Sequence, residues 1–254
     1  MPTNTPRQID AVQKTCRILE YLQDSGGAGV TEIAEELEFS KSVVHAHLAT
    51  LNEENLVVKD GYTYSLGLKF LDIAETAKNG VADHEIVRNQ VRELAEGTGE
   101  VVHFGAEENG RVVYVAKSKG ESAVETASRV GKRMPMHSTS LGKAILAEFS
   151  EDAVEQIVDQ HGLPEQTEHT ITDEERLYED LDTIRDRGYS IDNQENIPGV
   201  RCIGISVSAP EAGVLGALSI SGPSQRMTDD RIENELKETI AQAANVIEVN
   251  SRYQ

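Results

Sequence analysis

The chain has little of several residue types, and each shortage excludes a class of protein. Its two cysteines, at positions 16 and 202, are too few and too far apart for a disulfide framework or a zinc finger. The N-terminal stretch MPTNTPRQID lacks the apolar core of a signal peptide, and no long apolar run is present. A hydrophobic share of 38% also excludes a fully disordered chain. We therefore expect a cytoplasmic protein with no membrane partner.

Positive charge is also scarce. The 254 residues include 24 Lys plus Arg against 44 Asp plus Glu, which gives a net charge of -20. The acids are spread over the whole chain: residues 1–80 carry 7 basic and 12 acidic residues (7 − 12 = -5), which leaves -15 for the remainder. A diffuse acidic coat with only 4% aromatic residues is typical of a protein that stays hydrated at high salt. We therefore expect the source to be a halophilic archaeon.

The first 66 residues predict three helices followed by a hairpin. Apolar residues at helical spacing predict a first helix, with Ile9, Val12, Cys16, Leu19 and Leu22 on its buried face, which ends at the SGGAG stretch. Thr31 is expected to cap a short second helix, and Ser40 a third that runs to about Glu53. Alternating residues around Asp60-Gly61 then predict a hairpin. This order is that of a winged helix-turn-helix, whose hairpin is called the wing.

The third helix has features that suit a DNA major groove. Residues 39–52 contain no Asp or Glu, although the preceding TEIAEELE contains four acids. A helix that enters the groove needs short or polar side chains and no carboxylates beside the phosphates. We therefore predict a DNA-binding surface made of the exposed stripe of this helix, its cap and a wing lysine: Ser40, Lys41, Ser42, His45, Ala46, Ala49 and Lys59.

The rest of the chain predicts an α+β domain around an antiparallel sheet. A helix over about 68–79 connects it to the first part, and a helix over about 83–96 follows. Strands are expected in EVVHFGAEE and RVVYVAKS, joined by Asn109-Gly110, and then in AVETAS, YSIDN, CIGISVSA and VLGALSIS. Further helices are expected at 139–149, 151–160, 172–187, where Thr172 and Glu175 fit a capping box, and 228–249.

Four stretches of sequence together resemble the IclR type of transcriptional regulator. They are VTEIAEELEFSKSVVHAHLATL, YSLGLKFLDIA, MHSTSLGKAILA, and RGYSIDNQENIPGVRCIGISVSAP followed by GALSISGP. The resemblance covers the chain from about residue 7 to its end. It implies a winged helix-turn-helix DNA-binding domain at 7–68, with the helix-turn-helix at about 31–52. It also implies a GAF-like or profilin-like effector-binding domain at 69–254, including a linker helix at 69–80, and assembly as a dimer or a dimer of dimers.

The resemblance also carries a departure. Similar sequences often have Ser-Thr-Val-(Tyr or His)-Arg in the recognition helix, whereas this chain has Ser42-Val43-Val44-His45-Ala46. The threonine hydroxyl and the arginine are missing, so the operator sequence does not carry over from relatives.

A second group of residues is a candidate site for a small molecule. Ser219 and Ser221 lie two apart on one predicted strand, so both hydroxyls face one side of the sheet while Leu218 and Ile220 face the other. With Asp192 and Cys202 they offer donors and acceptors suited to a small polar acid. The resemblance adds the backbone amides of Ser140 and Leu141. It implies that these six residues bind an effector such as a sugar acid or keto acid. Met134, Met136 and Leu146 are candidate apolar walls or core residues.

The predicted function is sequence-specific DNA binding, at a palindromic operator, that is controlled by this effector. We expect no enzyme activity, no cofactor and no metal. The alternative is a cysteine-based redox enzyme or sensor, with Cys202 as nucleophile and His103 or His137 as base. A metal sensor using His45 and His47 is disfavoured because residues two apart on a helix diverge by about 200 degrees. An interaction protein with a degenerate DNA-binding domain is the remaining alternative.

The acidic coat predicts that stability depends on salt. When KCl is lowered from molar to tenths-molar concentration, repulsion between carboxylates is screened less, so the melting temperature should fall. Thermal unfolding followed by circular dichroism over a KCl series measures this. A melting temperature that is indifferent to KCl would contradict the inference of a halophilic source.

Overall fold

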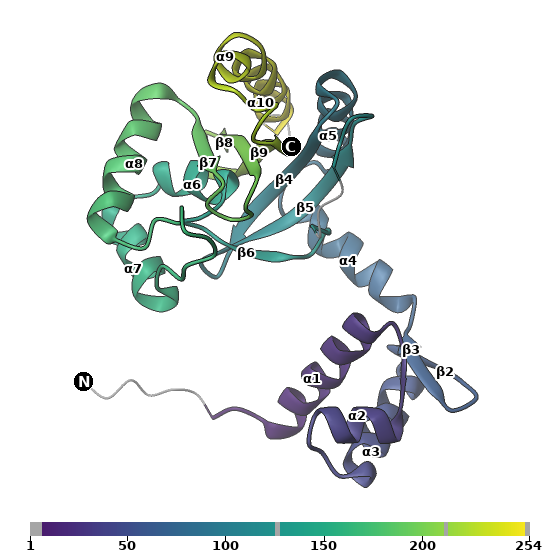
Figure 1. The fold of residues 1–254 in the computed structure, drawn as a ribbon. Helices are drawn as coiled ribbons and strands as arrows, with labels where there is room; N and C mark the ends of the chain where they lie inside the picture. The colour runs from purple at the N-terminus through teal and green to yellow at the C-terminus, as the bar shows by residue number, and fades with distance from the viewer. Residues whose placement is uncertain (1–6, 125–127, 211–212, 252–254) are drawn as a thin grey trace. The chain divides into compact units, whose positions relative to one another are not determined.

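A computed structural model describes residues 7–124, 128–210 and 213–251. The chain divides into two compact units, an N-terminal unit over Met1–Ala77 and a C-terminal unit over Lys78–Gln254, with the division inside one helix (Figure 1). In the described part of the chain, none of the helices combines the length and the apolar character that crossing a membrane requires.

The N-terminal unit contains the predicted helices and wing. Its elements are α1 (Asp10–Ser25), β1 (Ala28–Gly29), α2 (Val30–Glu36), α3 (Lys41–Glu53), β2 (Val57–Asp60) and β3 (Thr63–Leu66), followed by α4 (Lys69–Asn79). The three strands form an antiparallel sheet in the order β1-β3-β2. The Ser40 hydroxyl caps α3 by accepting the N–H of Val43 at 3.3 Å, as predicted. Val44, Leu48 and Leu51 are buried, as the spacing predicts.

The predicted buried face of α1 is wrong over its first half. Ile9 and Val12 are 66% and 56% exposed, and Cys16 is exposed as well. Leu22 is buried as predicted, Leu19 packs partly buried against the core, and Ile18 is buried although it was not predicted to be. The remainder of the small core comes from α2, α3 and the strands, and the α1 residues that join it lie in the second half of the helix. Apolar spacing therefore identified the helix, but it did not distinguish a face that packs inward from one that stays uncovered.

Two predicted helix caps are also displaced. The helix α2 begins at Val30 after Gly29, so Thr31 lies inside it and does not cap it. The helix α8 begins one residue later than predicted and is capped by Asp173, whose carboxylate accepts the Arg176 N–H at 3.0 Å. Asp is at least as good an N-cap as Thr, so the position of Asp173 decides the start.

The C-terminal unit is built on one six-stranded antiparallel sheet, which confirms the predicted α+β class. Its helices are α5 (His84–Thr98), α6 (Ser140–Ala147), α7 (Glu151–His161), α8 (Glu174–Arg187), α9 (Asp229–Arg231) and α10 (Lys237–Ser251), with a π-helical turn over Ile232–Leu236 before α10. Its strands are β4 (Val101–Glu108), β5 (Arg111–Lys119), β6 (Arg133–Pro135), β7 (Ser190–Asn193), β8 (Val200–Ala209) and β9 (Gly213–Pro223). The strand order is β6-β5-β4-β9-β8-β7.

One predicted strand is not found where it can be checked. AVETAS spans residues 123–128, of which 125–127 lie outside the described residues, and 123, 124 and 128 are not in a strand. The structure has the short strand β6 at Arg133–Pro135 instead, paired with β5. Only three residues long, β6 shows too little alternation to be predicted from the sequence.

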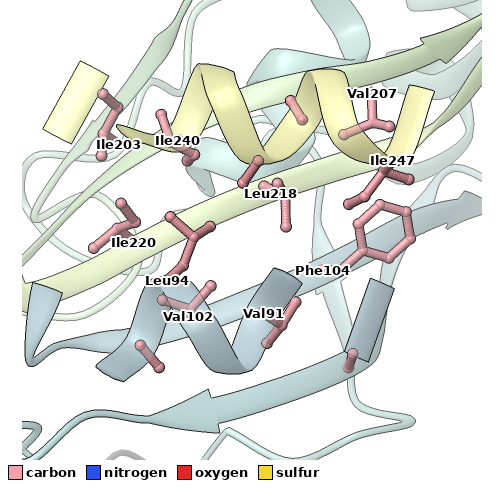
Figure 2. Close-up of a cluster of buried hydrophobic side chains, with 14 of the residues drawn as sticks. Val91, Leu94, Val102, Phe104, Ile203, Val207, Leu218, Ile220, Ile240 and Ile247 are labelled. Carbon is pink, nitrogen blue, oxygen red and sulfur yellow. The ribbon is translucent and has the colours of Figure 1, made fainter. Parts of the chain in front are cut away.

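Each face of the sheet carries its own core. One core joins α5 and α10 to the sheet, and Figure 2 shows Val91 and Leu94 of α5 and Ile240 and Ile247 of α10 around the strand residues. The strand residues in that core include Val102, Phe104, Leu218 and Ile220. The second core joins α6, α7 and α8 to the opposite face, and it includes Met134, Met136 and Leu146. These three residues are therefore core residues.

The helix α6 lies very close to the sheet because glycines allow the approach. A Cβ atom at Gly142 would lie 2.2 Å from the Met136 carbonyl oxygen. A Cβ atom at Gly204 of β8 would lie 2.6 Å from the Ser140 carbonyl oxygen. Every residue of α6 is buried. The glycines therefore fix the position of α6, and with it the position of Ser140 and Leu141.

Gly142 and Gly97 give a matched test of this packing. An alanine inside a helix normally stabilises it by up to about 1 kcal/mol relative to glycine. We expect this gain for Gly97→Ala in α5, where a Cβ atom meets nothing within 4 Å. Gly142→Ala should instead lower the free energy of unfolding by about 1–3 kcal/mol, since the new methyl group overlaps backbone atoms. Urea unfolding at high KCl measures both, and a stabilising Gly142→Ala would show that α6 can shift freely.

Candidate functional site

A small cavity opens between the sheet and the start of α6. All six residues predicted to bind a small molecule line it: Ser140, Leu141, Asp192, Cys202, Ser219 and Ser221. It lies on the α6 side of the sheet, opposite the core formed by α5 and α10. The structure therefore brings together residues that are separated by up to 81 positions in the sequence (221 − 140 = 81).

The strand register explains why the side chains meet. Asp192 on β7 pairs with Cys202 on β8, and Cys202 pairs with Ser221 on β9. These three side chains thus form one row across the sheet. Ser219 lies two residues from Ser221 on β9 and pairs with His103 on β4. Because directly paired residues project from the same face of a sheet, all five side chains point toward the cavity.

The start of α6 closes one end of the cavity. Thr139 caps the helix, and its hydroxyl accepts the Gly142 N–H at 3.1 Å. The Ser190 hydroxyl donates to the Ser140 carbonyl at 2.6 Å, which ties the helix to β7. The N–H groups of the first helical turn have no partner within the helix, so Ser140 and Leu141 present donors together with the positive end of the helix dipole. This geometry suits a carboxylate.

Asp192 is a buried carboxyl group in an environment that disfavours its charge. Its Oδ1 accepts the Glu195 N–H at 2.7 Å and the Asn196 N–H at 3.4 Å, and its Oδ2 lies 3.7 Å from the Cys202 thiol, which donates to it. Burial raises the pKa of Asp192 to about 7, and the nearby Glu195 adds to the effect. Burial also raises the pKa of Cys202 well above its usual value, as does the adjacent Asp192. The thiol is therefore protonated at neutral pH.

Lys143, on α6, lies close to Asp192 but serves other carboxylates. Its ammonium group is 2.7 Å from Glu195 Oε1 and 2.8 Å from Asp180 Oδ2, and its side chain is 1% exposed. Burial opposes the charge of Lys143, but Glu195 and Asp180 outweigh it and hold the pKa above its usual value. Two carboxylates thus neutralise this lysine, and among the described residues that line the cavity there is no Lys or Arg.

The sequence analysis did not place His103 and Tyr114 in this pocket. Their rings stack with centroids 4.6 Å apart, and His103 Nε2 lies 2.9 Å from the Ser128 hydroxyl. Burial lowers the pKa of His103 to about 3, and Lys117 adds to this, so the imidazole is neutral. Only the pairing of β4 with β9 and β5 reveals these residues, because no local sequence signal marks them.

The predicted DNA-binding residues lie in the N-terminal unit on α3, its cap and the wing. All seven are exposed: Ser40, Lys41, Ser42, His45, Ala46, Ala49 and Lys59. Lys59 also lies over the Tyr64 ring, 5.4 Å from its centroid. The exposed stripe of α3 therefore lies opposite the face formed by Val44, Leu48 and Leu51.

The geometry supports neither the cysteine-based redox alternative nor the metal-sensor alternative. His47 Nδ1 hydrogen-bonds Thr15 at 2.8 Å, whereas His45 is exposed on another side of α3. Among the described residues, no group of three or more His, Cys, Asp or Glu could hold a metal ion. A protonated, buried Cys202 beside a carboxylate is a poor nucleophile, because reactive cysteines have a lowered pKa.

The buried charge of Asp192 should make stability depend on pH. Its pKa is 3.8 when unperturbed and about 7 in the fold, so the folded state is favoured at low pH and loses this contribution as the pH rises toward 7. Asp192→Asn removes the charge, and its advantage over the wild type should grow between pH 4 and pH 8 to at most about 4 kcal/mol, at about 1.4 kcal/mol per pKa unit. Urea unfolding across this range, at constant high KCl, measures the difference.

The exposed Asp186 of α8 provides the matched control, as Asp186→Asn makes the same change of charge outside the cavity. A difference between Asp192→Asn and the wild type that stays constant from pH 4 to pH 8 would show that Asp192 ionises freely in the fold.

Comparisons with known proteins connect both sites to one family. Residues 11–61 match the IclR helix-turn-helix domain, and residues 81–249 match the family described as bacterial transcriptional regulator IclR C-terminal. The chain is 30% identical over 248 residues to the probable HTH-type transcriptional regulator ArcR of Halobacterium salinarum, covering 96% of this chain and 94% of that protein.

Solved structures agree with this assignment. The crystal structure of the Thermotoga maritima IclR aligns with a TM-score of 0.80 at 28% identity, covering 94% of this chain and 98% of that one. An IclR homolog of Microbacterium hydrocarbonoxydans, crystallised with 4-hydroxybenzoate, has the same fold, with a TM-score of 0.83 at 19% identity over 96% of this chain and all of that one. The chain therefore belongs to the IclR family, as a DNA-binding transcriptional regulator with a C-terminal effector-binding domain and not an enzyme.

Proposed function

We propose that this regulator binds a palindromic operator in the cytoplasm as a dimer or a dimer of dimers, and that a small organic acid such as a sugar acid or keto acid controls this binding. The observation that carries the proposal is the cavity at the start of α6. It brings helix N–H donors, serine hydroxyls, a thiol and the carboxyl group of Asp192 together in one small cavity. Such a mixture of donors and acceptors suits a small polar acid.

The orientation of the acid follows from the electrostatics of the cavity. Its carboxylate binds at the N–H groups of Ser140 and Leu141, since the helix dipole favours negative charge there. Its hydroxyl or other donor groups bind near Asp192, Ser219 and Ser221, where acceptor oxygens gather. Support for an acid as ligand also comes from the Microbacterium hydrocarbonoxydans homolog, which was crystallised with 4-hydroxybenzoate in the same fold.

Exposed apolar residues of the N-terminal unit support self-association. Ile9 and Val12 of the α1 region are more than half exposed, and Leu68 and Leu71 at the start of α4 are 81% and 67% exposed. Ile73 on α4 is 48% exposed. Exposed large apolar side chains on two helices of one unit are consistent with a protein–protein interface. A two-fold symmetric dimer through these helices matches a palindromic operator, because half-sites mirror the symmetry of the protein.

Helix α6 provides a route from the effector to the DNA-binding unit. Its first residues line the effector cavity, while Ile145 near its other end and Phe149 beyond it line a second groove. The same groove is lined by Gly80 and Val81, which directly follow α4. A shift of α6 on effector binding therefore reaches the residues that connect to α4. In this proposal α6 has a second arrangement besides the one described, and the effector populates whichever arrangement binds it more tightly.

A thermal-shift screen of sugar acids, keto-deoxy acids and aromatic acids at high KCl identifies the effector class. An acid that binds the folded state raises the melting temperature in proportion to the logarithm of its concentration. Gel shifts of upstream DNA regions, with and without that acid, then measure whether it controls operator binding. Effector control would be contradicted if the protein binds DNA and none of the acids that raise its melting temperature changes its affinity for DNA.

The double variant Ser221→Ala plus Asp192→Ala tests the cavity assignment. It removes a hydroxyl and the carboxyl group from the cavity, so the response of operator binding to the acid should be abolished. Operator affinity without acid should stay nearly unchanged, because neither residue belongs to the N-terminal unit. Gel-shift titrations with and without the acid measure both quantities.

The matched control is Ser206→Ala plus Asp186→Ala, which makes the same changes on β8 and α8 outside the cavity. This control should retain the response. If operator affinity collapses together with the response in the cavity variant, these residues support the structure and the cavity assignment is wrong.

A further inference from the structure

Among the described residues of the N-terminal unit, only one cation is paired with an acid, although the chain has 20 more acids than bases. Among the described residues of that unit, only Lys14 has a carboxylate within ion-pair distance, that of Asp10 at 2.6 Å. The described cations in ion pairs are far more numerous in the C-terminal unit: Arg92, Arg133, Lys143, Arg185, Arg201, Arg226, Arg231 and Lys237. This contrast suggests that the N-terminal cations serve a role other than forming ion pairs within the protein.

Two cations of this unit lie over one aromatic ring, and a third follows that ring closely in the sequence. Phe39 lies in the turn between α2 and α3 and packs against the core of the N-terminal unit. The guanidinium carbon of Arg17 on α1 is 4.7 Å from the centre of the ring, and the Lys14 ammonium nitrogen is 5.9 Å from it. Lys41, the first residue of α3, is two positions further along the chain. Arg17 and Lys41 are exposed.

The surroundings of this cluster favour a polyanion. The N-terminus of α3 adds the positive end of its dipole beside Lys41. Residues 39–52 contain no Asp or Glu, and the acids that flank this stretch are Glu38, in the turn directly before Phe39, and Glu53, at the far end of α3. Arg17 also donates to the Leu37 carbonyl at 3.3 Å, which holds its planar guanidinium group over the ring with other donors still available.

We propose that Lys14, Arg17 and Lys41 form a phosphate-binding clamp around Phe39 that holds the DNA backbone beside the start of α3. This inference rests on the proposed DNA-binding function and assigns new contacts to α1, outside the recognition helix and the wing. The ring orients the two α1 cations, and the dipole of α3 supplements them. Contacts of this kind position the protein on the duplex without reading its sequence.

A purely structural role for the two cations makes a different prediction. If Lys14 and Arg17 served only to cover Phe39, their replacement would change the stability of the protein and leave DNA binding unchanged. If they bind phosphates, replacement weakens binding to every sequence equally and reduces its dependence on salt. The salt dependence therefore separates the two roles.

The experiment uses the full-length protein and a fluorescein-labelled random-sequence duplex of about three helical turns. Fluorescence anisotropy over a KCl series gives the association constant for Arg17→Gln, Lys14→Gln and Arg92→Gln. The last variant makes the same change of charge on α5 of the C-terminal unit. We expect Arg17→Gln and Lys14→Gln to bind about three- to tenfold more weakly and to change the slope of log K against log salt by about 0.9 each. Arg92→Gln should match the wild type.

Phe39 variants test the role of the ring independently of charge. Phe39→Tyr keeps an aromatic ring and should bind DNA like the wild type, whereas Phe39→Leu keeps both cations but loses the ring and should bind several-fold more weakly. Melting temperatures at high KCl establish that each variant is folded. If Phe39→Leu does not fold, the charge variants decide alone.

Two results would overturn the clamp, and they differ in what else they imply. If the wild type binds the duplex and Arg17→Gln and Lys14→Gln bind with the affinity and salt slope of Arg92→Gln, the clamp is wrong while DNA binding stands. If the wild type binds neither this duplex nor upstream regions, both the clamp and the proposed function are wrong.

Discussion

Strand β9 has to meet two environments at once, and the cavity depends on this constraint. Leu218 and Ile220 are buried in the core beneath α5 and α10, while Ser219 and Ser221 face the cavity on the other side. A shift of one residue in the pairing of β9 would exchange the serines for the leucine and isoleucine. The core therefore enforces the register, and the register in turn sets Ser221 beside Cys202 and Ser219 beside His103.

The buried charges near the cavity show where stability is given up. Lys143 is matched by two carboxylates, so its burial is largely compensated. Asp192 has backbone N–H partners but no cation of its own, and its pKa near 7 expresses the cost of its charge. A ligand that donates hydrogen bonds to Asp192 recovers part of that cost. Buried groups that the fold alone leaves poorly satisfied are typical of binding sites.

Much of this fold follows from local sequence patterns, but the failures share a physical cause. The hairpin at Asp60-Gly61, the Ser40 cap and the alternation at Ser219 and Ser221 depend on neighbouring residues, so the sequence contains all the information needed. The buried face of α1 does not depend on neighbouring residues alone. Whether Ile9 and Val12 are covered depends on which distant elements, or which second chain, contact them.

The candidate site divides in the same way. The alternation along β9 indicates which way its serines face, and the four family motifs supply the other predicted residues. The stacked pair His103 and Tyr114 depends on the pairing of β4 with β5 and β9, which no local pattern specifies. Strand register between distant segments is therefore the information that was missing.

The acidic coat and DNA binding are compatible because charge is organised locally. At an ionic strength near one molar, charges more than about 3 Å apart are screened, so the net charge of -20 exerts little force on an approaching duplex. Direct contacts decide the outcome under those conditions. Among the described residues near α3, Arg17 and Lys41 have no carboxylate within ion-pair distance and Lys14 pairs only with Asp10. The C-terminal unit instead uses many of its cations in ion pairs. The pairing of Lys and Arg with carboxylates is therefore a better guide to what each unit binds than the number of Lys and Arg residues.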